Sequence, residues 1–570
     1  MASHRTAVRA GLFVVVAILA AVCGGGGGGI GTAPGTPPGT TPGTPVSGAP
    51  PQTASHALIA WNDLGMHCMD NDYSVFSILP PYNNLHAQLV DRATGRAVTA
   101  GVTVTYEATA DTRASVNSTS AGKTSFWSYV QALFGVSLPV NMGLAGNAAP
   151  AAAPASLVYD SAAGFWRAEG IPITAVDDAG LPNFYPMVRV VARDAQGTLL
   201  AETKTVLPVS DEMTCKRCHA SGGSEVARPP AGWVFDDNAE RDYRLNILRF
   251  HDSENFASPT SSALYASALA GAGYNATGLE NTVRLDGRPV LCAACHASNA
   301  LGTAGAPGVK PLTAAVHSRM ATAELPPTGL QLDSITDRSA CYACHPGGVT
   351  QCLRGAMGNA KDAAGNPTIQ CRSCHGNMSA VGDPARRGWI DLPDCSQCHY
   401  LSPATGTYVR DIGVFAPGGA ERPASGIFAS PVLYKAGTGH GGMRCEACHG
   451  PTHAEYPSSE PNDAVQGVLL QGHAGKITEC GVCHATVPLT GDGGPHGLHT
   501  IGQAWVTAHN TFVAGDPAQC RPCHGPDYLG TFLSAVSLDR SVTIDEQLTK
   551  ILARGRQVGC FDCHDGPRGG

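Results

Sequence analysis

The pattern Cys-x-x-Cys-His occurs nine times between residues 215 and 564, and it constrains this chain more than any other feature. A histidine directly follows every Cys-x-x-Cys pair in the sequence. The motifs use 18 of the 21 cysteines. The paired cysteines are Cys215 and Cys218, Cys292 and Cys295, Cys341 and Cys344, Cys371 and Cys374, Cys395 and Cys398, Cys445 and Cys448, Cys480 and Cys483, Cys520 and Cys523, and Cys560 and Cys563. The histidines that follow them are His219, His296, His345, His375, His399, His449, His484, His524 and His564.

This spacing suits a covalently attached c-type haem. On one helical turn, residues i, i+3 and i+4 share a face. Two cysteines can then form thioether bonds with the two vinyl groups, and the adjacent histidine can ligate the iron. A Cys₄ zinc site or a redox dithiol would use the cysteine pairs but not the histidine. We therefore expect nine c-type haems, each with its iron.

The motifs are closely spaced along the chain. From Cys215 to His564 there are 350 residues, and consecutive motifs begin 24 to 77 residues apart. So little protein per haem predicts a mostly irregular region with short helices, in which the porphyrins themselves form the core. Rings packed this closely would form a path for electrons.

Each haem iron also needs a sixth ligand or stays open to substrate. Eight further histidines of the motif-bearing region are candidates, and a ninth comes from the loop "WNDLGMHCMDNDYS". With nine such ligands every haem would have two histidines, which suits electron relay better than substrate binding. The candidates are His251, His317, His440, His453, His473, His496, His499, His509 and, in that loop, His67. His56 and His86 are histidine alternatives, and Met66, Met69 and Met320 are thioether alternatives.

Residues 54–210 differ from the motif-bearing region 211–570. They contain one cysteine, and "GVTVTYEATA", "MVRVVARD" and "AETKTVLPV" have the β-branched residues and partial alternation of strands. "SFWSYVQALF", residues 125–134, predicts a helix that ends at Gly135. We expect a β-sandwich-like domain, of immunoglobulin-like type, that precedes the nine-haem cytochrome domain and docks or anchors it.

The first residues resemble an export signal. A positively charged start is followed by an apolar run, residues 10–22, which is short for a membrane span. Cys23 follows "LAAV", which resembles a lipobox, so lipidation at Cys23, ordinary cleavage and an uncleaved anchor all stay open. Residues 24–53 form a Gly/Pro/Thr linker. We expect an exported protein at the outer-membrane surface or beyond the cell, with the periplasm as the alternative.

Net charge argues against one class of partner. The formal charge is −8, and there is no basic run of the kind that binds a phosphate backbone. Nucleic acid is therefore not an expected partner.

With these motifs in view, the chain resembles the secreted or outer-surface multihaem c-type cytochromes of metal-reducing bacteria. The haem motifs of residues 211–570 carry the resemblance, and "WNDLGMHCMDNDYSVFSILPPYNNLHAQLV" is similar to a β domain that precedes the haems in some of them. The resemblance implies a non-enzymatic carrier that passes electrons to metal oxides, electrodes or other cytochromes.

Three questions stay open at this point. One haem without a sixth protein ligand would instead make the chain a reductase of a small nitrogen or sulfur oxyanion. Some cytochromes of this kind polymerise, so the chain is alternatively a filament subunit. Cys68 and Cys352 form a disulfide between the two regions, stay as buried free thiols or, as a third alternative, ligate iron as thiolates.

Overall fold

The computed structural model describes residues 55–386, 395–410, 433–513, 516–544 and 548–567. The expected export signal, Cys23 and the linker lie outside the described residues. No helix in the described ranges combines the length and the apolar character that crossing a membrane requires. The described residues belong to one compact unit, so the strand-rich and motif-rich regions are in direct contact.

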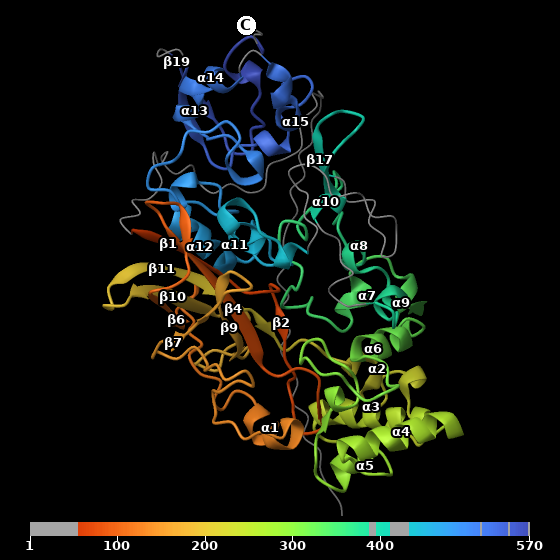
Figure 1. Cartoon of the computed structure of the whole chain (residues 1–570). Helices are drawn as coiled ribbons and strands as arrows, with labels where there is room; N and C mark the ends of the chain where they lie inside the picture. Colours follow the sequence, from red (N-terminus) through yellow and green to blue (C-terminus); the bar gives the residue numbers. More distant parts are fainter. Residues whose placement is uncertain (1–54, 387–394, 411–432, 514–515, 545–547, 568–570) are drawn as a thin grey trace, which may run out of the picture. The chain divides into compact units, whose positions relative to one another are not determined.

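Two antiparallel sheets make up most of the strand-rich region (Figure 1). The first sheet has the order β1 (His56–Trp61), β4 (Tyr82–Asp91), β9 (Phe165–Pro172) and β8 (Val158–Asp160), with β5 (Arg96–Val98) also paired to β4. The second has the order β11 (Leu199–Val206), β10 (Met187–Asp194), β6 (Val102–Thr109) and β7 (Ala155–Ser156).

One hydrophobic core lies between these sheets. Alternate residues of a strand point to the same face, and Val188, Val190 and Ala192 of β10 are fully buried there. They share a cluster with Leu85 and Ala87 of β4 in the other sheet. The strands predicted from "GVTVTYEATA", "MVRVVARD" and "AETKTVLPV" are confirmed as β6, β10 and β11.

Strand β1 is buried on both faces, which explains its nearly continuous apolar sequence "HALIAW". Leu58 and Ala60 belong to the core between the sheets. Ile59 and Trp61 belong to a second cluster with Leu470 from the motif-rich region. The first sheet therefore packs against part of the motif-rich region.

The predicted helix is confirmed as α1 (Phe126–Phe134). Phe126, Val130 and Leu133 form its buried face, and Gly135 closes the helix in the left-handed conformation at φ 70°. Gly135 donates its N–H to the carbonyl of Gln131. Two short parallel pairs follow. Strand β12 (Val209–Ser210) pairs with β2 (His67–Cys68) within the strand-rich region, and β13 (Val290–Leu291) pairs with β3 (Phe76–Ser77) and so connects the two regions.

Helices dominate the motif-rich region, and the longest lie where the motifs are furthest apart. Between the first and second motifs, α3 (Ala239–Asn255), α4 (Pro259–Ala272) and α5 (Leu279–Arg284) share a hydrophobic cluster with Val75 and Phe76 of the strand-rich region. The other helices are α2 (Lys216–His219), α6 (Leu312–Met320), α7 (Ser339–Tyr342), α8 (Cys371–His375), α9 (Met378–Val381), α10 (Cys395–Cys398), α11 (Cys445–His449), α12 (Pro461–Gln471), α13 (Gln503–Ala508), α14 (Asn510–Val513) and α15 (Arg521–His524).

Three small hairpins complete the described strands of this region. They are β14 (Glu324–Leu325) with β15 (Leu330–Gln331), β16 (His399–Leu401) with β17 (Tyr408–Arg410), and β18 (Arg540–Ile544) with β19 (Leu548–Leu552).

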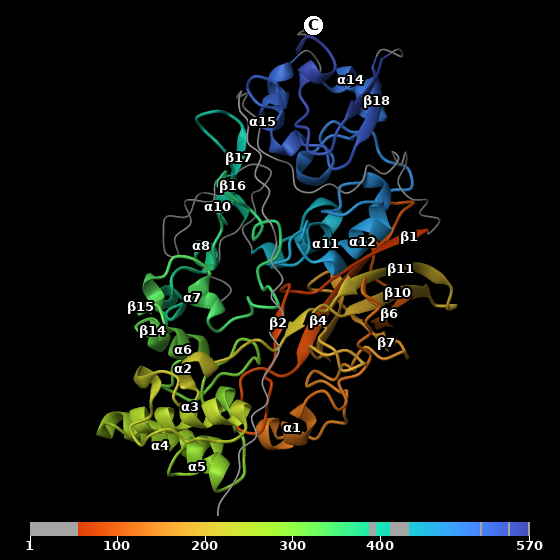
Figure 2. The same cartoon turned by 180° about the vertical axis from the view of Figure 1, so that it is seen from behind.

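Helix α12 lies against strands β1 and β11 in both views (Figures 1 and 2). The Gln466 side-chain oxygen of α12 accepts hydrogen bonds from the Ala60 N–H at 2.8 Å and from the Thr203 hydroxyl at 3.2 Å. Next to it, the Trp61 indole donates to the Glu446 carboxyl of α11 at 3.0 Å. Polar contacts as well as apolar ones therefore hold the two sheets against the motif-rich region.

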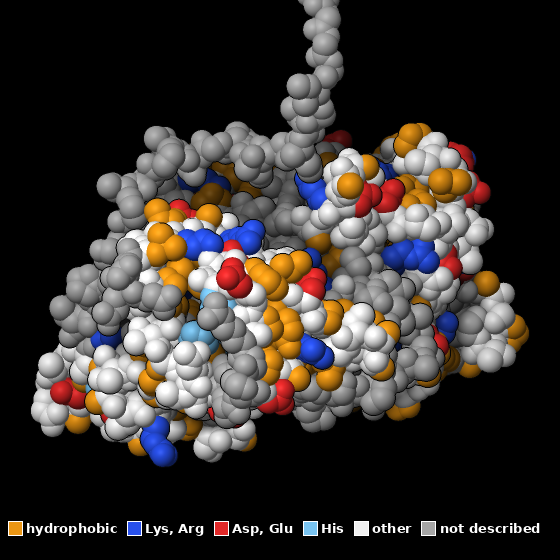
Figure 3. All heavy atoms as spheres, turned by 90° about the horizontal axis from the view of Figure 1, so that it is seen from above, with side chains coloured by type: hydrophobic (Ala, Val, Ile, Leu, Met, Phe, Trp, Pro, Cys, Tyr) orange, Lys and Arg blue, Asp and Glu red, His pale blue; other side chains and the backbone are white. Residues whose placement is uncertain are grey.

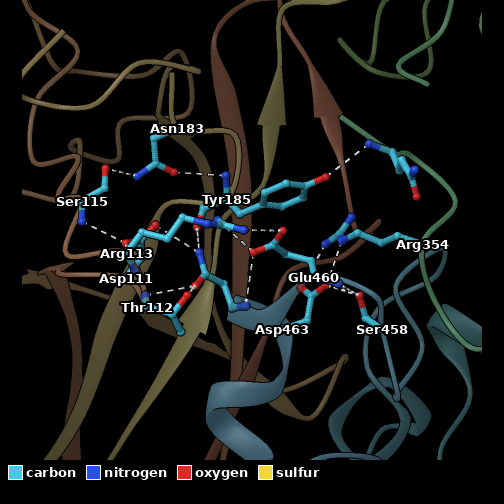
Figure 4. A network of polar contacts seen from close by, with 12 residues as sticks. Asp111, Thr112, Arg113, Ser115, Asn183, Tyr185, Arg354, Ser458, Glu460 and Asp463 are labelled. Atoms are coloured by element: carbon cyan, nitrogen blue, oxygen red, sulfur yellow. Dashed lines mark hydrogen bonds and ion pairs between the residues drawn. The ribbon is translucent and has the colours of Figure 1, made fainter. Parts of the chain in front are cut away.

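A buried ion pair lies at the start of α12 (Figure 4). Arg354 donates to Asp463 at 2.7 and 3.0 Å, and both side chains are 1% exposed. Arg354 also donates to the Gly65 carbonyl and lies over the Tyr185 ring. Beside this ion pair, the side-chain amide of Asn462 donates a hydrogen bond to the Tyr185 carbonyl at 2.9 Å. Residues from both regions are thus joined in a single polar network.

Candidate haem-binding site

Each cysteine–histidine motif forms a short helical turn. The histidine N–H donates to the carbonyl of the first cysteine, for example at 3.0 Å from His219 to Cys215 and at 2.8 Å from His345 to Cys341. This i, i+4 bond brings the two sulfurs and the imidazole to one side of the turn, as the spacing predicts. The second, seventh and ninth motifs form 3₁₀ turns, at Cys292–Ala294, Cys480–Val482 and Cys560–Asp562.

Seven of the nine motif histidines lie beside a histidine from elsewhere in the chain. In every case the two ring centres are 5.9 to 6.4 Å apart. The pairs, with the motif histidine second, are His251 and His296 (6.4 Å), His317 and His345 (6.1 Å), His453 and His375 (6.0 Å), His440 and His484 (6.1 Å), His496 and His449 (5.9 Å), His499 and His524 (6.0 Å), and His509 and His564 (6.2 Å).

The separation is informative because it is nearly constant and longer than that of stacked rings in contact. Direct contacts are shorter, as in the stacking of His499 on Trp505 at 3.9 Å. A metal bound about 2 Å from a nitrogen of each ring would hold the two ring centres about 6 Å apart. The pairs therefore fit a single iron between two imidazoles. Among the described residues, no group of three or more His, Cys, Asp or Glu side chains is arranged to hold a metal.

Backbone carbonyls fix the orientation of several of these rings. His317 donates from Nδ1 to the Thr313 carbonyl at 2.8 Å, and His296 donates to Lys310 at 2.7 Å. A carbonyl only accepts, so Nδ1 carries the proton and Nε2 keeps a free lone pair. His499, His509, His524 and His564 have equivalent bonds at 2.7 to 3.0 Å. The chain thus sets the tautomer that metal ligation through Nε2 requires.

Cysteines of different motifs lie close together, in an order that departs from the sequence. Burial, followed by the neighbouring Cys344, raises the pKa of Cys215 to about 12. Burial raises the pKa of Cys292 to about 12 as well, with a contribution from Cys215. The first motif therefore lies between the second and the third.

The later motifs follow one another in sequence order. The neighbouring thiols of Cys341 and Cys371 shift each other's pKa, upward for Cys341 and downward, to about 7, for Cys371. Burial and then Cys398 raise the pKa of Cys374 to about 12, which places the fifth motif next to the fourth. In the same way, Cys483 contributes to the raised pKa of Cys448, and Cys520 contributes to that of Cys560. His399 of the fifth motif contributes to the lowered pKa of His449 of the sixth. These neighbours link the described motifs from the second through the first to the seventh, and the eighth and ninth form a separate pair of neighbours.

Two candidate ligands do not lie beside a motif histidine. His67 is buried and its Nε2 is 2.7 Å from the carboxylate of Asp63. His473 donates from Nδ1 to the Ala474 carbonyl at 3.0 Å, and its Nε2 is 3.4 Å from Glu479. Nε2 of each of these two histidines thus lies beside a carboxylate. His86 is likewise buried, between Trp61 and Phe165.

The structure leaves the two remaining described cysteines unbonded. Cys68 and Cys352 are free, and burial followed by the charge of Cys352 raises the pKa of Cys68 above its usual range. Cys352 Sγ is 3.8 Å from Nδ1 of His453. Between the disulfide and the free thiols, the structure has the free thiols.

Phenylalanine rings lie near the two other motif histidines. Phe250 of α3 is 6.4 Å from His219, and Phe532 is 6.2 Å from His399. Phe250 was not among the candidate site residues predicted from the sequence. The signal in the sequence was the run "NILRFHD", which contains the candidate ligand His251. Adjacent residues on a helix point about 100° apart, so Phe250 and His251 face different neighbours.

Comparison of the chain with protein-family models, with curated proteins and with solved structures found no match.

Proposed function

We propose that this chain is an electron-transfer protein that holds nine c-type haems covalently and relays electrons through them to extracellular acceptors. The observation that carries the proposal is the set of seven histidine pairs. Each pair joins one motif histidine to one non-motif histidine at nearly the same ring separation. Neither zinc binding nor thiol chemistry accounts for that regularity.

When bound, a c-type haem supplies four porphyrin nitrogens and a one-electron iron couple, so the chain must supply two sulfurs and two axial ligands. The motif cysteines are the sulfurs, and the paired histidines are the axial ligands. A second imidazole closes the iron to substrate. Nδ1 bonds such as that of His317 to Thr313 hold the ligand ring in one orientation, which limits rearrangement when the charge of the site changes.

The order of the motif cysteines supports relay over distance. Because each cysteine bonds the edge of a porphyrin, neighbouring sulfurs bring neighbouring rings close together. The contact of Cys341 with Cys371 and the proximity of Cys374 to Cys398 link three successive motifs in this way. A continuous series of such contacts is what a relay needs and what a single-site enzyme does not.

Metal oxides, electrodes and other cytochromes are the proposed acceptors, on the basis of the resemblance and the export signal. The face in Figure 3 has basic, acidic and hydrophobic side chains interspersed, and histidine side chains reach its surface. His440 and His496, the non-motif members of two pairs, are both exposed. Redox centres near the surface are accessible to an external acceptor.

The test combines intact mass with spectroscopy of protein made in a host that attaches c-type haem. We expect a mass increase of nine haems and a mainly low-spin spectrum. Replacing a paired histidine, His317→Ala, should convert one iron to high spin and raise its potential. The matched control His473→Ala removes a histidine bonded to Glu479 and should change neither property. A protein without bound haem, or equal effects of the two variants, contradicts the proposal.

A further inference from the structure

Helix α3 presents different side chains to two neighbouring motifs. His251 lies 6.4 Å from His296 of the second motif, and Phe250 lies 6.4 Å from His219 of the first. The same helix also contacts the first motif through Asn246, whose amide donates to the His219 carbonyl at 3.1 Å. Phe250 is therefore at the ring separation that a second histidine has in the seven pairs.

A phenyl ring has no lone pair and cannot ligate iron. Among the described residues, no other histidine has a ring contact with His219. The histidines outside the pairs are engaged elsewhere, with His67 on Asp63 and His473 on Glu479. In the described part of the chain, the first motif thus has one axial ligand where its neighbours have two.

A second feature also distinguishes His219. Its Nδ1 is buried and has no hydrogen-bond partner among the described residues. By contrast, His296, His524 and His564 donate from Nδ1 to backbone carbonyls. Without an acceptor behind it, the His219 imidazole is a weaker donor to iron.

We propose that the iron held by His219 is open, with Phe250 in place of a sixth ligand, and that it binds a small uncharged ligand of the carbon monoxide or nitric oxide type. The inference rests on the proposed function and adds a binding site to the relay. The first motif lies next to the second across α3, and Thr214 beside it donates its N–H to the Cys344 carbonyl of the third at 3.4 Å, so the site would have a neighbouring motif on both sides.

The ligand class follows from the residues around Phe250. The phenyl ring offers hydrocarbon and no hydrogen-bond donor, and an anion buried there would lose its hydration without compensation. Arg319 lies over the Phe250 ring at 5.6 Å, but it is paired with Glu254 at 3.4 Å, which offsets its charge. A neutral diatomic molecule fits this environment better than an oxyanion.

The experiment compares wild type with Phe250→His and Phe250→Leu in the haem-loaded full chain. Wild type and Phe250→Leu should both show high-spin ferric iron and should bind carbon monoxide when reduced. Phe250→His should lose the equivalent of one high-spin iron and one bound carbon monoxide per chain, because it supplies the missing ligand. If the histidine variant fails to load nine haems, Phe250→Met supplies a thioether at the same position for the same comparison.

Three results overturn the inference. One is a fully low-spin wild type with no carbon monoxide binding, and another is a Phe250→His variant indistinguishable from wild type. The third is a high-spin signal that appears only on dilution, which would mean that a second copy supplies the ligand. Nitrite binding at the Phe250-dependent site in preference to carbon monoxide overturns the ligand class. Each result requires nine bound haems, whereas absence of haem contradicts the proposed function itself.

Discussion

The strand-rich and motif-rich regions obtain their cores in different ways. Between its two sheets the first has one cluster of twenty buried hydrophobic residues. Around the third motif, the cluster of fully buried hydrophobic residues consists of Leu325, Leu332 and Ala340. Three side chains offset little of the entropy of ordering the chain around them. The comparison indicates that the first region has an extensive core of its own, whereas the protein supplies little core around the third motif, as expected if bound haems were to complete it.

The largest effect should follow from withholding haem. In a host that does not attach haem, residues 211–570 should fail to fold, while the two sheets should keep their shared core. Limited proteolysis should then leave a protected fragment of approximately residues 55 to 210 with strand-type circular dichroism. Equal protection of both regions would remove the difference between them.

Next in size is the loss of the buried Arg354–Asp463 ion pair at the start of α12, which contacts the strand-rich region through Gly65 and Tyr185. Arg354→Ala leaves the Asp463 carboxylate buried without its cation, so we expect a loss of about 3–5 kcal/mol in the free energy of unfolding. Arg113→Ala is the matched control, since the Arg113 side chain is 57% exposed and its pair with Glu460 should contribute about 0–1 kcal/mol. Denaturant titration of haem-loaded protein measures both. Similar losses of unfolding free energy in the two variants would mean that burial does not determine how much an ion pair contributes to stability.

A smaller effect should appear in the acid dependence of stability. Burial lowers the pKa of His86 to about 4, and the nearby charges of Lys435, Arg444 and Arg167 add to the effect while Asp63 opposes it. Between pH 4 and 6.5 the unfolded chain therefore binds a proton that the folded chain does not, and stability falls as pH falls through this window. His86→Phe fits between Trp61 and Phe165 and should flatten that slope. An unchanged slope would contradict the assignment to His86.

The smallest effect should be confined to one haem site. Gly95 has φ 67°, and an added Cβ would lie 2.4 Å from Cε1 of His484, so Gly95→Ala should displace that ring from His440. Gly101 has a similar φ of 74° with no atom within 4 Å, so Gly101→Ala reproduces the backbone strain without the clash. Redox titration should show one shifted potential in the Gly95 variant alone. If the potential shifted in both variants, the cause would be backbone strain in the strand-rich region and not the clash with His484.

Local sequence determined the parts of the site that lie within a single turn. The positions of all nine motif histidines follow from the Cys-x-x-Cys-His spacing, because residues i, i+3 and i+4 share a face of any helical turn. The strands β6 and β10 and the helix α1 followed from periodicity in the same way. The pool of further histidines was also evident from composition.

Which histidine faces which motif was decided only by the tertiary structure. His453 follows the sixth motif by four residues but lies beside His375 of the fourth, and His67 and His473 lie beside carboxylates instead. Phe250, adjacent to a paired histidine, lies beside His219. These outcomes depend on contacts between segments far apart in the chain, and the spacing of residues within one segment carries no information about them.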